Sequence, residues 1–383
     1  MSLFDQLKEK KMRIGIPKEI KVHEYRVGMT PAAVREAVSH GHQALVQAGA
    51  GAGVNCGDAQ YVAAGAEIVS TAAEVFDRAD MIVKVKEPQP TECAMLREGQ
   101  VLFTYLHLAP DPEQARLLRE SGCTAIAYET VTGQSGGLPL LAPMSEVAGR
   151  MSIQVGATCL QKACGGRGVL LGGIPGVHPA RVVILGGGVA GAQAVRIAIG
   201  MGAEVIVLDN SLPRLRQLDD IFGARLHTVF ATSQTTEDAV LTADIVVGAV
   251  LVPGAAAPKL VRREHLAGMR SGAVLVDISI DQGGCFETSR TTTHQEPTYE
   301  VDGIVHYCVA NMPGAVPHTS TVALTNATLP YTLALADKGW KRACSDDPYL
   351  RQGINIHAGD LVCETVARSL GLSYRPALEA LAM

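Results

Sequence analysis

The stretch that decides the fold is ARVVILGGGVAGAQAVRIAIGMGAEVIVLDNS, residues 180–211. An apolar run, Val182–Leu185, leads into glycines with the spacing GxGxxG: Gly186, Gly188 and Gly191. A helical stretch, Val189–Gly200, comes next, and a second apolar run, Val205–Leu208, ends at Asp209. This order predicts a strand, a tight turn, a helix and a parallel strand, which is the opening unit of a doubly wound α/β sheet.

The same spacing indicates a dinucleotide site. Gly186 permits the turn, Gly188 lets the backbone approach a pyrophosphate, and Gly191 lets the helix pack on the sheet. The N–H groups of the first helical turn, at Val189 and Ala190, face the phosphates. Asp209 can accept hydrogen bonds from both ribose hydroxyls and would repel a 2′-phosphate, so NAD is favoured over NADP. A purely structural turn or another ligand stays the alternative, and Arg214 could still attract a 2′-phosphate.

Further apolar runs extend this unit to a domain of residues 141–316. The expected strands are Val182–Leu185, Val205–Leu208, Leu226–Phe230, Ile245–Leu251, Val274–Ile280 and Ile304–Val309. Helical patterns cover Val189–Gly200 and Leu212–Ile221, and Met144–Lys162 is expected to form a long connecting helix.

A first α/β series precedes this domain, from about residue 12 to residue 135. Its expected strands are Met12–Pro17, Gln43–Gln47, Met81–Val85, Val101–Leu106 and Cys123–Ala127. Thr30 followed by Pro31 predicts the start of a helix. Ser320–Ala336 and Ala358–Leu370 are predicted to be helical. The fold class is therefore α/β, with two Rossmann-like, doubly wound parallel-sheet domains.

Bulk properties narrow the function. The chain has 383 residues, enough for two domains, with a net charge of −5 and a pI near 6.1, which argues against a nucleic-acid partner. Since we find neither a membrane span nor a secretory signal, we expect a soluble, cytoplasmic protein. The nine cysteines show no CxxC or Cys/His cluster, so we expect reduced thiols and no metal site.

Charged residues interrupt or follow three buried-strand patterns. Lys84 and Lys86 end one run, His107 follows the next, and Asp281 ends a strand of the second domain. Ligands of open α/β sheets bind beyond the carboxyl ends of the strands, so these positions predict a site. Each has an ordinary alternative: a solvated lysine, a structural histidine, a helix cap. Arg26 alone would be a surface charge. Together they suit a small carboxylate substrate.

Long collinear blocks carry a family resemblance. They include KVKEP (84–88), LFTYLHLA (102–109), PLLAPMSEVAGR (139–150), GAVLVDISIDQGGCFE (272–287), YCVANMPGAVP (307–317) and ALTNATLPY (323–331). In these blocks the chain resembles the alanine dehydrogenases from Met12 to about Leu372. The transhydrogenase α-subunits and saccharopine dehydrogenases match these blocks less well.

The resemblance implies NAD-dependent interconversion of L-alanine with pyruvate and ammonium. It implies that the NAD domain, 141–316, is inserted into a discontinuous substrate domain, 1–140 plus 317–383, that substrate and cofactor meet between the two, and that the protein is a homo-hexamer. Arg26 would bind the substrate carboxylate, Lys86 would contact the substrate, His107 would act as acid and base, and Asp281 would hold the attacking water.

The resemblance also implies a wider set of cofactor contacts. Beside the glycine loop they are Ser145, Asp209, Arg214, Val250, Leu251, Ile278, Ser279, Ile280, Asp281, Arg290, Val309, Ala310, Asn311 and Met312. Three positions depart from the family pattern. His23 stands where asparagine is common, Ala231 replaces a serine, and Lys338 replaces a histidine proposed to bind magnesium with the acid at Glu129.

Two other functions remain open at this point. The chain could be the soluble nucleotide-binding component of a transhydrogenase-like assembly, or an amino-acid dehydrogenase of other specificity. An assay of NADH oxidation with pyruvate and ammonium separates the first alternative from an alanine dehydrogenase, and a panel of 2-oxo acids separates the second.

Overall fold

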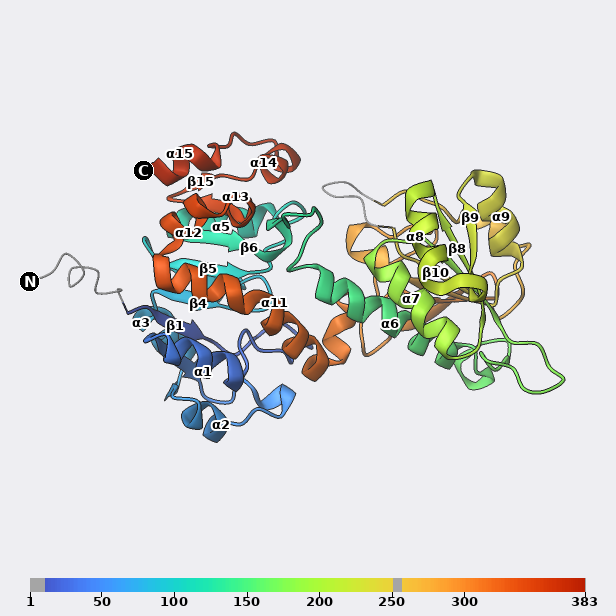
Figure 1. The fold of residues 1–383 in the computed structure, drawn as a ribbon, viewed down its shortest axis with the longest axis horizontal. Coiled ribbons are helices and arrows are strands. Elements are labelled where there is room, and N and C mark those ends of the chain that lie inside the picture. Colours follow the sequence, from blue (N-terminus) through green and yellow to red (C-terminus); the bar gives the residue numbers. More distant parts are fainter. Residues whose placement is uncertain (1–10, 251–256, 383) are drawn as a thin grey trace, which may run out of the picture. The chain divides into compact units, whose positions relative to one another are not determined.

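A computed structural model describes residues 11–250 and 257–382. Its contacts divide the chain into two compact units (Figure 1). Unit 1 consists of the described residues up to Pro143 and from Val316 onward, and unit 2 of those from Met144 to Ala315. The assignment of substrate binding to unit 1 and of NAD binding to unit 2 remains a prediction. Both units are parallel-dominated α/β layers, so the predicted fold class is confirmed.

Unit 1 is built on an eight-stranded sheet of described residues, in the order β15-β14-β6-β5-β4-β1-β2-β3. The strands are β1 (Arg13–Ile16), β2 (Gln43–Gln47), β3 (Glu67–Val69), β4 (Met81–Val83), β5 (Val101–Thr104), β6 (Thr124–Ala127), β14 (Ile354–His357) and β15 (Asp360–Leu361). The first six strands run parallel, whereas β14 pairs antiparallel with both β6 and β15.

Helices connect the strands of unit 1. They are α1 (Pro31–Ser39), α2 (Asp58–Ala63), α3 (Ala72–Arg78), α4 (Pro90–Cys93), α5 (Pro112–Ser121), α11 (Pro317–Lys338), α12 (Trp340–Asp346), α13 (Pro348–Arg351), α14 (Glu364–Leu370) and α15 (Ala377–Ala382). Helix α1 begins as predicted: the Thr30 hydroxyl accepts a hydrogen bond from the Ala33 amide, and Pro31 is the first helical residue. Buried side chains of α3, α4, α5 and α14 form one hydrophobic core with the sheet.

The C-terminal prediction for unit 1 is partly wrong. Ala358–Leu370 was expected to be helical throughout, but β15 lies inside this range and only α14 is helical. Gly353 and Gly359 bracket β14, and Ala358 and Gly359 turn the chain with positive φ into β15. Strands of four and two residues are too short for a period-2 pattern to stand out from a helical one.

Unit 2 contains a seven-stranded sheet of described residues, in the order β12-β13-β11-β10-β7-β8-β9. The strands are β7 (Arg181–Leu185), β8 (Glu204–Asp209), β9 (His227–Phe230), β10 (Ile245–Gly248), β11 (Val274–Asp277), β12 (Thr298–Val301) and β13 (Ile304–Tyr307). The helices are α6 (Ala142–Cys159), α7 (Val189–Gly200), α8 (Leu212–Phe222), α9 (Ser233–Leu241) and α10 (Arg263–Leu266). Only β12 is antiparallel, paired with β13.

Several predicted strands of unit 2 end earlier than expected. β10 stops at Gly248 and β13 at Tyr307, while β11 stops at Asp277 and gives way to the 3-10 helix η6 (Ile278–Gln282). The apolar runs continue past the strands because the residues that follow are also buried, as Val309 and Ile280 are. Leu251, a predicted cofactor contact, lies outside the described residues.

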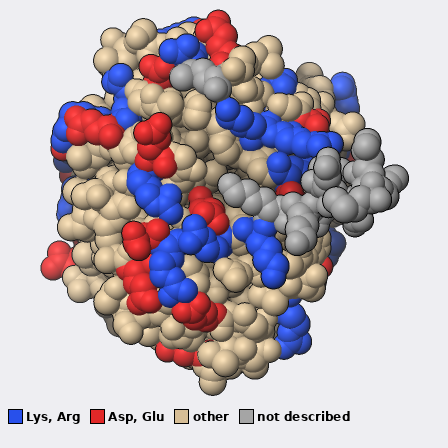
Figure 2. Space-filling view, turned by 90° about the vertical axis from the view of Figure 1, so that its left-hand side faces the viewer, with Lys and Arg blue, Asp and Glu red and all other residues tan. Residues whose placement is uncertain are grey.

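None of the described helices is long and apolar enough to cross a membrane. On the face drawn in Figure 2, lysine and arginine side chains are interspersed with aspartate and glutamate. Charges of both signs therefore share this face.

Candidate active site

Lys86 and His107 lie beyond the carboxyl ends of neighbouring strands in unit 1. Lys86 comes three residues after β4 and His107 three residues after β5, and these two strands pair in parallel. Hydrogen bonds continue the pairing beyond the strands: Tyr105 N–H donates to the Val85 carbonyl at 3.3 Å, and the Thr104 hydroxyl donates to the Lys86 carbonyl at 3.0 Å. The structure therefore holds these two segments together at one edge of the sheet.

Arg26 reaches the same edge from the loop that follows β1. A Cβ added at Gly28 would lie 2.4 Å from the Val83 carbonyl oxygen, so glycine is required there for the loop to approach the end of β4. Arg26 is 2% exposed, and its charge acts on the phenol of Tyr105, next to His107. An arginine without a motif around it would be taken as a surface residue, but this one is buried.

Arg26 is held by Glu24, which the sequence did not single out. Nε of Arg26 donates to Oε1 of Glu24 at 2.7 Å and Nη2 donates to Oε2 at 2.6 Å. Burial opposes the charge of Arg26, but this carboxylate outweighs burial and raises the pKa of the guanidinium. The arrangement fixes the plane of the guanidinium before any substrate is present.

His107 combines a strained backbone with an accessible ring. Its φ is +50°, and its side chain is 40% exposed. The Glu129 carboxylate stabilises this conformation, because Oε1 accepts the His107 amide at 2.7 Å and lies 3.6 Å from Nδ1. The ring stacks on Tyr105 at a centroid distance of 5.7 Å. An oriented imidazole that remains accessible suits an acid–base role.

Lys84 does not belong to this group, which corrects the expectation that two lysines converge on the substrate. Its ammonium is fully buried and donates to Glu19 at 2.9 Å and to Glu92 at 2.7 Å. Burial opposes its charge, but the two carboxylates outweigh burial and raise the pKa of Lys84. Residues two apart share a face only while the strand continues, and β4 ends at Val83, before either lysine.

Glu87 is a second carboxylate that the sequence did not single out, although it lies in the block KVKEP. Its side chain is 12% exposed, Oε1 accepts a hydrogen bond from Lys21, and Oε2 lies 3.6 Å from Nζ of Lys86. Burial opposes its charge, but Lys86, Lys21 and His107 outweigh burial and hold the pKa of Glu87 below its usual value. The position of Glu87 directly after Lys86 in the sequence was the signal that could have identified this carboxylate.

In unit 2 the glycine loop has the geometry that its spacing predicts. Gly186 has φ +98°, and a Cβ at Gly191 would lie 1.9 Å from the Gly186 carbonyl oxygen. At Gly188, the N-cap of α7, a Cβ would meet no protein atom within 4 Å. Gly191 is thus required for packing, whereas the space at Gly188 is open. Ser145 lies in the first turn of α6, and four residues later a Cβ at Gly149 would meet the Ala190 carbonyl oxygen at 2.1 Å.

Asp209 ends β8 beside this loop. Its carboxylate accepts the Gly187 amide at 2.7 Å and the Ser211 amide at 2.8 Å. The Arg214 guanidinium donates to the Gly187 carbonyl at 2.6 Å and to the Gly188 carbonyl at 3.4 Å. Arg214 therefore supports the loop, and these hydrogen bonds compete with any contact to a 2′-phosphate.

The remaining predicted cofactor residues follow β10, β11 and β13. The Ser279 hydroxyl donates to the Val250 carbonyl at 2.6 Å, which joins the loops after β10 and β11. Ile278, Ser279, Ile280 and the exposed Asp281 all belong to η6. Asp281 thus follows the strand by four residues and does not end it, and it lies in a different unit from His107.

The predicted contacts after β13 lie in a loop and in a short helix. Val309 is buried, Ala310 donates to the Thr292 carbonyl at 3.2 Å, Asn311 has φ +57°, and Met312 begins the 3-10 helix Met312–Ala315. Arg290 is exposed, and its guanidinium carbon lies 3.9 Å from the centre of the Tyr299 ring.

Asp277 is a residue of unit 2 that the sequence did not single out. It ends β11 and is fully buried. Its carboxylate accepts hydrogen bonds from the amides of Ser279 (3.0 Å) and Cys285 (2.9 Å) and from the Ser289 hydroxyl (2.5 Å), and so joins both ends of the loop that carries Asp281. Burial outweighs these donors and raises the pKa of Asp277. An acid inside the apolar run VLVDIS was the available signal.

The positions that depart from the family pattern have local roles. His23 has φ +59°, a conformation that asparagine tolerates well, and Nδ1 lies 3.0 Å from the Tyr25 hydroxyl. Lys338 pairs with Asp346 at 2.8 Å, whereas Glu129 binds backbone amides. Ala231 packs at the margin of the core of unit 2. Among the described residues, no group of three or more His, Cys, Asp or Glu could hold a metal ion.

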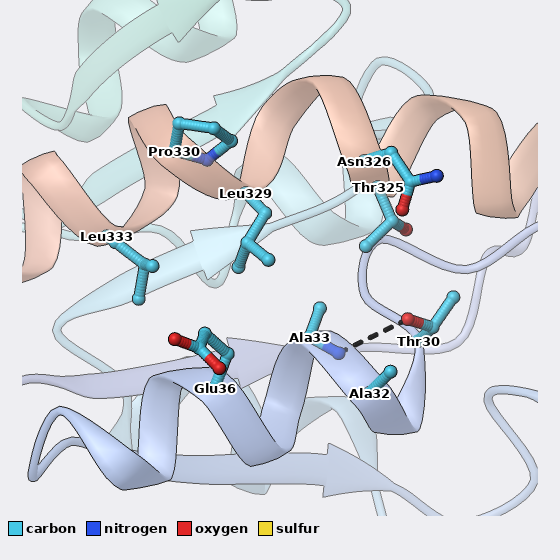
Figure 3. Close-up of a pocket in the computed structure, with 9 residues that line it drawn as sticks. All are labelled: Thr30, Ala32, Ala33, Glu36, Thr325, Asn326, Leu329, Pro330 and Leu333. Atoms are coloured by element: carbon cyan, nitrogen blue, oxygen red, sulfur yellow. Dashed lines mark hydrogen bonds between the residues drawn. The ribbon is translucent and has the colours of Figure 1, made fainter.

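A groove of about 350 Å³ lies elsewhere in unit 1, between α1 and α11 (Figure 3). Leu329 and Leu333 of α11 point toward α1, and Thr30, the N-cap of α1, lines one end. It contains none of the predicted substrate residues.

Comparison with known proteins covers nearly the whole chain. Residues 15–148 match the family described as alanine dehydrogenase/PNT, N-terminal domain, and residues 152–364 match its C-terminal domain. The alanine dehydrogenase of Halomonas elongata is 59% identical over 363 residues, which is 95% of this chain and 98% of that protein.

Solved structures agree with this result. An L-alanine dehydrogenase superposes with a TM-score of 0.91 at 50% identity, covering 94% of this chain and 99% of that one. A transhydrogenase from Sinorhizobium meliloti gives a TM-score of 0.78 at 25% identity, covering 92% and 99%. With both domain families and a relative at 59% identity, the chain belongs to the alanine dehydrogenase/PNT family.

Proposed function

We propose that this protein is an NAD-dependent L-alanine dehydrogenase, which interconverts L-alanine with pyruvate and ammonium. The observation that carries the proposal is the edge of unit 1, where a buried arginine, a lysine and an accessible imidazole follow three neighbouring strands, β1, β4 and β5. Such a set can bind one carboxylate and exchange one proton. Family membership supplies the substrate class.

The cofactor assignment depends on the fit of the loop in unit 2. Open space at Gly188, at the N-terminus of a twelve-residue helix, suits the close approach of a pyrophosphate. Asp209 is oriented by two amides and can accept further hydrogen bonds from ribose hydroxyls, which favours NAD over NADP. Val250, Ser279 and the Val309–Met312 segment would complete the site.

In the deamination direction of the mechanism we propose, NAD, when bound, would accept the hydride that leaves the substrate Cα. Arg26 holds the carboxylate through its planar guanidinium, and Lys86 faces the reacting carbonyl or carbinolamine oxygen. His107 accepts a proton from the alanine ammonium. Water then adds to iminopyruvate, and Asp281 holds that water. As the C–N bond of the carbinolamine breaks, His107 returns its proton to the leaving nitrogen to give ammonium, and the hydroxyl proton passes to solvent to leave pyruvate.

One assay tests the proposal directly. The purified chain is mixed with NADH, pyruvate and ammonium, and NADH oxidation is followed by absorbance, with NADPH and other 2-oxo acids in parallel. We expect turnover that requires both pyruvate and ammonium and is faster with NADH than with NADPH. No ammonium-dependent turnover with any 2-oxo acid would overturn the proposal, and turnover only with another 2-oxo acid would change its substrate.

The alternative, a soluble transhydrogenase component, has less support. The transhydrogenase structure is 25% identical to this chain, against 59% for the Halomonas relative. The proposal also includes a cytoplasmic homo-hexamer, on the strength of the family alone. Light scattering of the purified protein measures the number of subunits.

A further inference from the structure

The ion pairs around the edge of unit 1 that carries Lys86 and His107, the proposed substrate edge, contain more acidic than basic side chains. The cations are Lys21, Arg26, Lys84 and Lys86, and the carboxylates are Glu19, Glu24, Glu87, Glu92 and Glu129, which lies beside His107. Each cation therefore has a carboxylate partner. A substrate that brings one carboxylate and one ammonium leaves this balance unchanged, whereas a second carboxylate adds to the excess of negative charge.

Among these carboxylates, Glu87 is the one that combines proximity to the reacting groups with an unused acceptor. Its Oε2 is buried and accepts no hydrogen bond from the described residues, although Nζ of Lys86 lies 3.6 Å away. Its Oε1 is anchored by Lys21. The charge of His107 also acts on Glu87, so both proposed substrate residues influence this carboxylate electrostatically. In contrast, Glu19 and Glu92 are occupied by Lys84, and Glu24 by Arg26.

We propose that Glu87 determines the charge specificity of the site: it positions the Lys86 ammonium, favours the ammonium partner of the reaction, and disfavours substrates with a second carboxylate. This inference depends on the proposed function, because it assumes that Lys86 and His107 face the substrate. Lys86, Lys21 and His107 lower the pKa of Glu87 against the effect of burial, which favours the ionised carboxylate.

The test compares Glu87→Gln, which removes the charge and keeps the shape, with Glu87→Asp, which keeps the charge and shortens the side chain. Glu113→Gln is the matched control, since Glu113 is an exposed carboxylate of the same unit and pairs with Arg116. Two inhibitors of equal chain length report on charge: 2-oxoglutarate, a dicarboxylate, and 2-oxovalerate, a monocarboxylate. Their inhibition constants against pyruvate are measured together with the ammonium KM and kcat.

We expect the parent enzyme and Glu113→Gln to bind 2-oxovalerate much more tightly than 2-oxoglutarate. In Glu87→Gln this preference should fall about tenfold and the ammonium KM should rise about tenfold, with a smaller change in kcat, because the lost carboxylate repels a second substrate carboxylate and attracts ammonium. Glu87→Asp should keep the preference for the monocarboxylate while its altered reach raises the ammonium KM.

Either of two results would overturn the inference: an unchanged inhibitor ratio and ammonium KM in Glu87→Gln, or loss of the preference in Glu87→Asp. If Glu87→Gln does not fold, as judged by circular dichroism, the Glu87→Asp ratio decides alone. Failure of the proposed function is seen separately, because the parent enzyme would then show no ammonium-dependent turnover.

Discussion

The carboxylate of Glu24 and the guanidinium of Arg26 form a two-point salt bridge, with Nε 2.7 Å from Oε1 and Nη2 2.6 Å from Oε2. Both side chains are shielded from solvent, at 0% and 2% exposure. Removing one partner of such a buried pair leaves the other charge uncompensated, so the pair favours the local conformation that keeps Glu24 and Arg26 together. The proposed substrate-binding group is therefore oriented by the protein itself.

Arg26→Lys should raise the pyruvate KM about tenfold or more, because one ammonium can satisfy neither Glu24 nor a substrate carboxylate in two-point fashion. Steady-state kinetics with varied pyruvate measures this change. Arg78→Lys is the control, since Arg78 makes a comparable bond to Glu67 at an exposed site. An unchanged KM in Arg26→Lys would place the carboxylate site elsewhere.

His107→Ala should lower kcat about a thousandfold while NADH binding stays nearly the same, because a general acid–base group is lost and the residues proposed to bind NADH belong to unit 2. Turnover is measured with pyruvate and ammonium, and NADH binding by its fluorescence. His178→Ala, a change at an exposed histidine of unit 2, should affect neither. If His107→Ala instead loses NADH binding, the role assigned to the imidazole is wrong.

Much of the architecture could be predicted because its signals are local. The glycine loop, the helix Val189–Gly200 and the Thr30–Pro31 helix start are all specified by residues that contact one another within a few positions. The antiparallel strand β14 was not predicted, because its four residues are defined by pairing with β6, more than two hundred positions earlier.

The residues of the candidate site also fall into two groups, those that the sequence could identify and those that only the folded structure reveals. Residue type and position at a strand end were enough to select Lys86 and His107 for a site, and the structure brings them to one edge. Burial could not be read from the sequence, so Lys84 was grouped with Lys86 although two carboxylates enclose it. Glu24 and Glu87 matter through partners that only the folded chain provides.

The raised pKa of the Asp277 carboxyl group predicts an unusual dependence of protein stability on pH. Burial raises its pKa in the folded state above 3.8, so the folded state binds a proton more readily than the unfolded state. The carboxylate therefore costs stability above its folded pKa, and the parent protein regains this stability as the pH falls through that pKa toward 3.8.

Asp277→Asn removes this titration while leaving every other carboxylate in place. The stability of the parent minus that of Asp277→Asn should accordingly be larger near pH 4 than at pH 7.5, as measured by urea denaturation at each pH. A difference that is constant, or that grows with pH, would contradict the raised pKa. Asp238→Asn, an exposed change in unit 2, should show no such trend.

Two glycine substitutions in one loop should separate folding from cofactor binding. In Gly191→Ala the new methyl group would lie 1.9 Å from the Gly186 carbonyl oxygen, so α7 must shift and unit 2 should lose roughly 3 kcal/mol of stability.

In Gly188→Ala the methyl group meets no protein atom within 4 Å, so stability should hardly change. The same methyl group would occupy the space through which a pyrophosphate approaches the N-terminus of α7, and the NADH Kd should rise about tenfold or more. Thermal unfolding and NADH fluorescence titration measure the two effects independently. Wild-type NADH affinity in Gly188→Ala would mean that the phosphates bind elsewhere, because a pyrophosphate at this turn would meet the added methyl group.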